Sequence, residues 1–117
     1  MNKTFFLIFF PIICLSQSIQ KTFNNLQKHI EVNDFKTSER IIDSLIMKEP
    51  SNNDWIVSKA EISANLNKIN KSNQLLRKAF NQGYYVYDKY SNKNGILFKK
   101  LNKTKEYQIL LNDIKNF

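Results

Sequence analysis

The sequence predicts an all-α fold in which tandem helix-turn-helix units are followed by capping helices at the C-terminal end. Apolar residues recur at spacings of three and four, which is the spacing of one helix face. The stretch 32–46 also has a counterpart 34 positions later, at 66–80. Finally, the 117 residues include only 2 Gly and 2 Pro, fewer than the tight turns of an all-β protein require.

Composition indicates one small domain with a packed core, because 42% of the residues are hydrophobic and 13% are aromatic. The formal net charge of +8 favours partners such as nucleic acid, anionic lipid or acidic protein. The lysines are scattered, however, and no run of them is longer than Lys99–Lys100. Charge alone therefore does not locate a binding patch.

Residues 1–16 have the pattern of a secretory signal peptide. Lys3 precedes an apolar run of 11 residues, 5–15, which is too short to span a bilayer as a helix of about 20 residues. Cys14 and Ser16 are small residues placed three and one positions before a cut after Ser16. We expect an exported domain at 17–117, periplasmic or secreted. An uncleaved membrane anchor is the alternative, and a bulky Ile13 before the cysteine disfavours a lipoprotein.

The first two helices are expected at 18–31 and 35–48. Asn33 and Asp34 separate them, with Asp34 (or Asn33) as the N-cap of the second helix. Pro50 ends the second helix. Residues with helical spacing form the apolar faces: Ile19, Phe23, Leu26, Ile30, Ser38, Ile41, Ile42, Leu45 and Ile46.

The third and fourth helices are expected at 55–66 and 70–82, with Asp54 as the cap of the third. Gly83 can adopt a positive φ and therefore ends the fourth helix. The apolar positions of this second unit again follow those of the first at the same interval of 34 positions. The repeats accordingly cover about 19–52 and 53–86.

A helical cap is expected at 87–117, because a stack of repeats leaves an apolar face open at its end. Ile96 to Leu101 has the pattern of a short helix, and Thr104 is the expected cap of a final helix that contains Tyr107 and Leu110. The preceding cluster is rich in tyrosine, and it either covers the open end of the repeats or stacks bases or sugars: Tyr84, Tyr85, Tyr87 and Tyr90.

Two helices per 34-residue period resemble the tetratricopeptide repeat. In that family a small residue is followed four positions later by a large one, as in Ser38 with Ile42 and Ser72 with Leu76, and Pro50 matches the proline that closes a repeat. The C-terminal segment is similar to the tails that follow some bacterial arrays of this family. The resemblance thus implies a small exported bacterial protein whose domain is a fragment of an α-solenoid.

The resemblance also implies a non-catalytic module that binds a peptide segment or protein partner in a groove lined by the first helix of each repeat. The set is polar, so we expect a preference for polar or basic segments. The 34-residue register places these residues in the groove: Gln20, Phe23, Gln27, Ile30, Glu31, Asp54, Val57, Glu61, Ala64 and Asn65.

The sequence offers no grouping of residues that predicts catalysis. It lacks a Gly-rich phosphate loop and a metal-spaced His and Cys set, and its one histidine, His29, is expected to pack between the first two helices. We therefore expect no enzyme, no cofactor and no metal. The alternative function is charge-driven binding of an anionic polymer or a membrane surface. Nucleic acid is not expected as a partner, and the sequence does not indicate an oligomeric state.

Overall fold

The computed structural model describes residues 18–117, and within that range all regular secondary structure is helical. The expected all-α fold is thereby confirmed. The signal peptide expected at 1–16 lies outside the described residues. The helical segments are 18–31, α2 (Phe35–Lys48), α3 (Asn53–Asn65), α4 (Ile69–Asn81), α5 (Tyr87–Ser91), α6 (Ile96–Leu101) and α7 (Lys105–Lys115).

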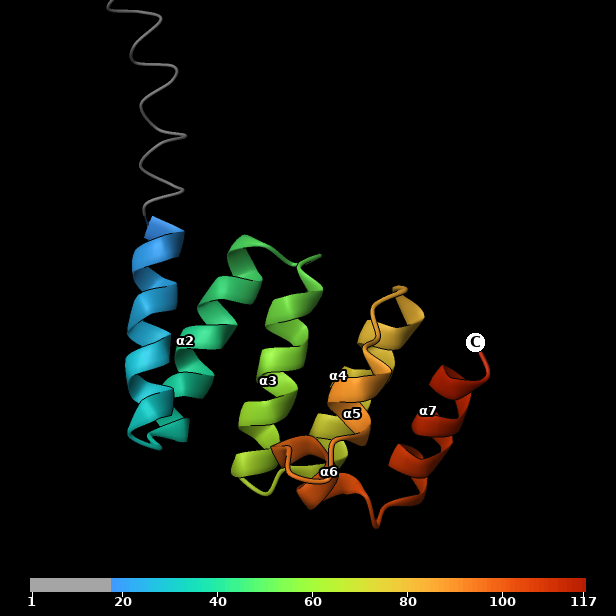
Figure 1. Ribbon diagram of the computed structural model, residues 1–117. Helices are drawn as coiled ribbons and strands as arrows, with labels where there is room; N and C mark the ends of the chain where they lie inside the picture. Colours follow the sequence, from blue (N-terminus) through green and yellow to red (C-terminus); the bar gives the residue numbers. More distant parts are fainter. Residues whose placement is uncertain (1–17) are drawn as a thin grey trace, which may run out of the picture.

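The N-terminal helix at 18–31, α2, α3 and α4 stand side by side in chain order, and α7 lies at the other end of the molecule (Figure 1). These four helices alternate in direction, because the connections between them are short (Figure 1). The helix α3 packs against α2, α4 and α6, while α7 packs against α4 and α5. The central position of α3 makes it the element that joins the N-terminal half to the C-terminal half.

No helix in the range 18–117 has both the length and the apolar character needed to cross a membrane.

Burial follows the 34-residue period. Four positions in the 18–31 helix and α2 are at most 1% exposed, and so are their counterparts in α3 and α4. This arrangement of two matching helix pairs is compatible with a helical repeat. The matching pairs are Leu26 with Ala60, Ser38 with Ser72, Ile42 with Leu76, and Leu45 with Ala79.

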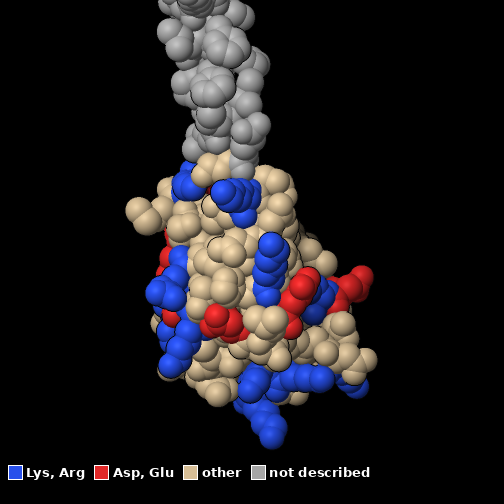
Figure 2. All heavy atoms as spheres, turned by 90° about the vertical axis from the view of Figure 1, so that its left-hand side faces the viewer, with Lys and Arg blue, Asp and Glu red and all other residues tan. Residues whose placement is uncertain are grey.

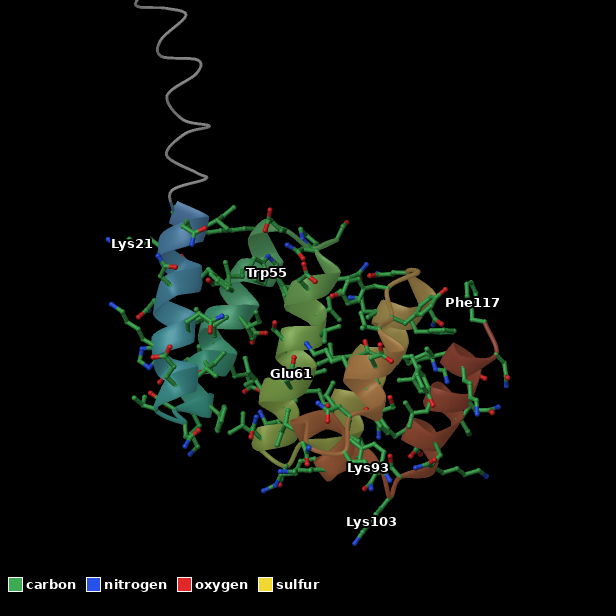
Figure 3. The ribbon with its side chains drawn as sticks, in the orientation of Figure 1. Lys21, Trp55, Glu61, Lys93, Lys103 and Phe117 are labelled. Carbon is green, nitrogen blue, oxygen red and sulfur yellow. The ribbon has the colours of Figure 1, made fainter. Side chains whose placement is uncertain are left out.

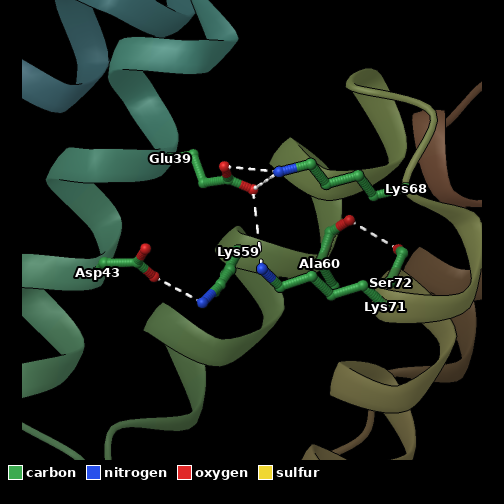
Figure 4. A network of polar contacts seen from close by, with 7 residues as sticks. All are labelled: Glu39, Asp43, Lys59, Ala60, Lys68, Lys71 and Ser72. Atoms are coloured by element: carbon green, nitrogen blue, oxygen red, sulfur yellow. Dashed lines mark hydrogen bonds and ion pairs between the residues drawn. The ribbon is translucent and has the colours of Figure 1, made fainter.

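The small residues at these positions allow close approach of the helices. Ser72 is fully buried on α4, and its Oγ donates a hydrogen bond of 2.7 Å to the carbonyl of Ala60 on α3 (Figure 4). Ser38 instead donates to the carbonyl of Asp34, within its own helix turn. The buried hydroxyls of Ser38 and Ser72 therefore each have an acceptor.

The start of α2 agrees with the sequence, and the start of α3 does not. Asp34 caps α2, because its carboxylate accepts from the backbone N–H of Thr37. The cap of α3 is Asn52 and not Asp54, so the helix begins at Asn53, earlier than expected. Asp54 lies instead in the first turn, where a carboxylate interacts favourably with the helix dipole. Its carboxylate is thus free to bind a residue of another element.

Two apolar clusters form the core, and α3 contributes to both. The 18–31 helix, α2 and α3 enclose a cluster that contains Leu26 and Ile62. Residues from α3 to α7 enclose a larger one that contains Val57 and Leu101. Trp55 packs against the cluster that contains Leu26, and its indole Nε1 donates a 2.8 Å hydrogen bond to Glu49 that fixes the turn before α3.

The C-terminal segment packs against α3 and α4. The short helix α6 and the capping of α7 by Thr104 are confirmed, whereas α5 was not expected. Tyr90 of α5 is fully buried, and its carbonyl accepts a 2.6 Å hydrogen bond from the hydroxyl of Tyr107 on α7. Tyr84 and Tyr85 also pack against the larger cluster. Most of the tyrosine cluster therefore covers the core.

Candidate partner-binding surface

The residues expected to line a groove lie on the 18–31 helix and α3, which are in contact. The rings of Phe23 and Trp55 meet with their centroids 5.4 Å apart. On the N-terminal helix, Gln20, Gln27 and Glu31 are exposed. Their side chains are spaced so that they occupy one side of the helix. This part of the predicted surface is open to solvent.

Phe23 and Ile30 anchor that surface. Both are half-buried and pack against the N-terminal core cluster, with Leu26 and Ile42. Only their outer edges can reach a partner. The polar residues of the helix therefore present most of the chemistry on this side.

On α3, the C-terminal segment already occupies the predicted groove positions. Val57 is only 1% exposed because it belongs to the core cluster shared with Tyr84 and Tyr90, and Ala64 is also buried. The expectation that these two side chains line an open groove is therefore wrong. A pattern of helical spacing cannot reveal that another segment folds over one part of the face.

Two carboxylates of α3 bind that same segment. The hydroxyl of Tyr84 donates a 2.5 Å hydrogen bond to Asp54, and Lys89 of α5 forms a 2.8 Å ion pair with Glu61. Figure 3 shows Glu61 midway along α3 and Trp55 near its upper end. We call the side of the molecule that carries Gln27, Glu31, Asp54 and Glu61 the acidic face.

The electrostatics of these contacts differ. The hydrogen bond to the Asp54 carboxylate, with some desolvation, raises the pKa of Tyr84 to about 12, since it favours the neutral phenol. The Lys89–Glu61 pair is partly exposed, with 45% and 32% of the two side chains accessible. Exposed ion pairs contribute about 0–1 kcal/mol. A cation from a partner can therefore replace Lys89 at small cost.

Asn65 is the last of the predicted groove residues along the chain. Its side-chain amide donates a 3.0 Å hydrogen bond to the carbonyl of Glu61 one turn earlier. It is half-buried and lies close to the turn that ends α3. Its position limits it to the edge of the acidic face.

His29 has a local partner. Its Nδ1 lies 3.1 Å from a carboxylate oxygen of Asp34 across the turn between the first two helices. Hydrogen bonds from Thr37 lower the pKa of Asp34, and the contact with His29 acts in the same direction. Within residues 18–117, no group of three or more His, Cys, Asp or Glu side chains is arranged to hold a metal ion.

The carboxylates of α2 pair with lysines of the next helix pair (Figure 4). Glu39 lies 2.8 Å from Lys68 and 4.0 Å from Lys71, and Asp43 lies 2.6 Å from Lys59. These pairs connect the two helix pairs across their junction. They also commit both carboxylates of α2 to contacts inside the molecule.

Two cavities lie away from the acidic face, and the sequence did not predict either. A pocket of about 410 Å³ between α4 and α7 includes Asn73, which is 6% exposed. The hydroxyl of Thr104 donates to the carbonyl of Leu101, so it must accept from the amide nitrogen of Asn73. The amide oxygen of Asn73 therefore points away from Thr104. This oxygen is buried and has no hydrogen-bond partner among the described residues.

The second cavity is a cleft of about 840 Å³ between the 18–31 helix and α2. Comparing equivalent positions of the two units would have indicated it, because Lys21 and Lys28 stand where the second unit has the apolar Trp55 and Ile62. The lining residues are Lys21, Thr22, Asn24, Asn25, Lys28, Thr37, Arg40, Ile41 and Ser44.

Comparisons of this chain with protein-family models, with curated proteins and with solved structures find no match. The arguments for its function therefore depend on the residues and contacts described above.

Proposed function

We propose that this protein is a tetratricopeptide-like helical-repeat module that binds a protein partner and catalyses no reaction. The correspondence of buried positions between the two units, with two helices in each unit, supports the repeat assignment. The leader pattern at 1–16 supports a location in the bacterial envelope or the secreted space. On this proposal the repeats are a scaffold that presents the acidic face.

The contact that carries the proposal is the ion pair between Lys89 and Glu61. The chain's own C-terminal segment crosses α3 and offers a cation to Glu61 and a hydroxyl to Asp54. A basic segment of a partner would make the same kind of contacts, with Glu31 as a further carboxylate on the neighbouring helix. Gln20 and Gln27 would add hydrogen bonds to its backbone.

The size of the surface limits the affinity. Two repeat units present only a short face, and α5 already covers part of it. Interfaces well below about 1,200 Å² belong mostly to weak or transient complexes. We therefore propose modest affinity for an isolated peptide and stronger binding for a partner that also contacts the exposed ends of the array.

Partner capture tests the proposal. The tagged full chain is crosslinked in its native cell envelope, and the captured molecules are identified by mass spectrometry at low and moderate salt. One protein partner that resists the salt supports the module. Capture of many different molecules that are lost between about 50 and 200 mM salt favours the alternative function, charge-driven binding of an anionic polymer or a membrane surface.

Charge reversal on the acidic face separates the two cases further. Glu31→Arg combined with Glu61→Arg should release a partner held by its basic residues. Glu106→Arg is the control for Glu31→Arg, because both carboxylates are exposed and each change adds the same charge. If the double variant captures the partner as well as the unmodified chain does, the acidic face is not the binding surface.

A further inference from the structure

The cleft between the 18–31 helix and α2 is lined by cations. Of its nine lining residues, Lys21, Lys28 and Arg40 carry positive charge, and none is a carboxylate. Figure 3 shows Lys21 projecting away from the rest of the molecule at its N-terminal end. Figure 2 looks onto this end, where several Lys and Arg side chains project. We call this cavity, with its three cations, the basic cleft.

The cations of the basic cleft have no acidic partner. None of the ion pairs within residues 18–117 includes Lys21, Lys28 or Arg40. Asp and Glu side chains also lie on this end of the molecule (Figure 2). Glu31, three positions after Lys28 on the same helix, is exposed and does not line the cleft. The next carboxylates along the chain are engaged elsewhere. Asp34 binds Thr37 and His29, and Glu39 and Asp43 pair with lysines of α3 and of the segment that begins α4.

A need for solubility explains a polar surface here but not a positive one. In the second unit the positions equivalent to Lys21 and Lys28 are Trp55 and Ile62, which pack in the core cluster that also contains Leu26. Lys21 and Lys28 are exposed, and polar side chains at exposed positions keep a protein soluble. Glutamate or glutamine would serve that purpose equally well. Lysine at both positions, with Arg40 on the other wall, instead makes the cleft positive, and a positive cleft attracts anions.

The spacing of the cations indicates the shape of that ligand. Lys21 and Lys28 are seven positions apart on one helix, so they lie about 10 Å apart along its axis. Arg40 faces them from α2, where its guanidinium donates a 3.4 Å hydrogen bond to the hydroxyl of Thr37. Asn24 and Asn25 place amide groups between the two lysines. The three cations are therefore spread along the cleft, and a ligand with several negative charges can contact more of them than a single small anion can.

We propose that the basic cleft binds a ligand with two or more phosphate groups, either a soluble oligophosphate or the headgroups of an anionic lipid surface. Arg40 would hold one phosphate with paired N–H donors, and the lysines would act as flexible point charges on the others. The cleft lies on the outer side of the first helix pair, away from the Lys89–Glu61 contact. The site therefore does not depend on the proposed protein partner.

Calorimetric titration of the full chain with sodium tripolyphosphate tests the site, at about 50 mM salt. The variant carrying Lys21→Ser, Lys28→Ser and Arg40→Ser should bind the probe at least about tenfold more weakly. The control carries Lys103→Ser, Lys105→Ser and Lys115→Ser, which removes the same charge from exposed positions at the other end. The control should change the affinity less than about threefold. Both variants lose the same general charge attraction, but only the cleft variant loses direct contacts with the probe.

Two results overturn the site. Absence of binding to the unmodified chain does so, as does equal weakening in the two triple variants. All six lysine and arginine positions are exposed, so each variant should keep its helical circular dichroism spectrum. Should the cleft variant lose that spectrum, the single changes Lys21→Gln, Lys28→Gln and Arg40→Gln replace it, and each must weaken binding more than Lys103→Gln does.

Vesicles distinguish the two sources of phosphate. Sedimentation with phosphatidylcholine vesicles, with and without phosphatidylglycerol, is compared for the two triple variants. If the cleft variant alone loses the extra binding that phosphatidylglycerol confers, the ligand is a lipid surface. If the cleft variant loses tripolyphosphate and keeps its vesicle binding, the ligand is a soluble oligophosphate. Both results support the cleft, and neither bears on capture of a protein by the acidic face.

Discussion

Asn33 and Asn67 occupy equivalent positions of the two units and adopt the same left-handed backbone conformation, with φ of 60° and 61°. Each follows a helix, and in each turn the next residue's N–H reaches back to a carbonyl five positions earlier, that of His29 in one case and of Ser63 in the other. This is the hydrogen-bond pattern of a Schellman motif. The same turn thus joins the two helices of each pair.

The left-handed turn predicts opposite effects for two substitutions of Asn33. Asn33→Gly should leave stability unchanged or raise it by up to about 1 kcal/mol, because glycine adopts positive φ without a steric penalty. Asn33→Ala should lower it by about 1 kcal/mol. Urea unfolding followed by circular dichroism measures both. Asn25→Gly is the control: Asn25 is exposed within the 18–31 helix, so glycine there should destabilise. A stabilising Asn33→Ala would contradict the turn.

The buried serines predict the cost of crowding the helix junctions. Ser38→Leu and Ser72→Leu should each lower the free energy of unfolding by roughly 1–3 kcal/mol, because both side chains are fully buried where helices approach closely. Thermal unfolding checks this against Ser51→Leu, a change in the exposed turn before α3. Unchanged melting temperatures at both buried serines would show that the 34-residue register is wrong.

Two buried tyrosines of the cap should respond differently to removal of the hydroxyl. Tyr107→Phe deletes the 2.6 Å hydrogen bond to the carbonyl of Tyr90 and should cost about 1–2 kcal/mol. Tyr90→Phe should be neutral or stabilising, because the hydroxyl of Tyr90 is buried without a partner among the described residues. Chemical denaturation of both variants provides the comparison. Equal losses would mean that the hydroxyl of Tyr90 is bonded in solution.

Alkaline pH should destabilise the fold through the same region. The folded state holds the proton of Tyr84 up to a pKa of about 12, against 10.0 for an unperturbed tyrosine. Between these values the unfolded state binds fewer protons than the folded state, so the free energy of unfolding falls as pH rises. The contribution of Tyr84 to stability is fully present below pH 10. Burial raises the pKa of Tyr90 and Tyr107 as well, which adds to the same trend.

Tyr84→Phe isolates that contribution. The variant should show a shallower loss of stability between about pH 10 and pH 12 than the unmodified chain, measured by urea unfolding at several pH values. Tyr87→Phe removes a hydroxyl from a ring that is 40% exposed and serves as the control. If the free energy of unfolding falls with pH at the same slope in the unmodified chain and in Tyr84→Phe, the hydrogen bond between Tyr84 and Asp54 does not cause the loss of stability.

Local signals in the sequence predicted most of the helices. The bounds of α2 agree with the spacing of its apolar residues and with Asp34 as its cap. Gly83, with φ of 83°, ends α4 through the expected positive-φ turn, and Thr104 caps α7. These features depend on residues close together in the chain, so a linear pattern is enough to find them. The start of α3 was placed wrongly because Asn52 and Asp54 are both good caps, and Asn52 is the one used.

What the sequence determined by itself is the all-α class and the 34-residue correspondence of buried positions, since both follow from short-range spacing. Only the tertiary structure decided which surfaces remain open. Val57 is buried and Glu61 is paired because Tyr90 and Lys89, which come much later in the chain, fold back over α3. The basic cleft likewise depends on how the 18–31 helix packs on α2, because residues of both helices line it. Such contacts between distant segments leave no periodic signal in either segment alone.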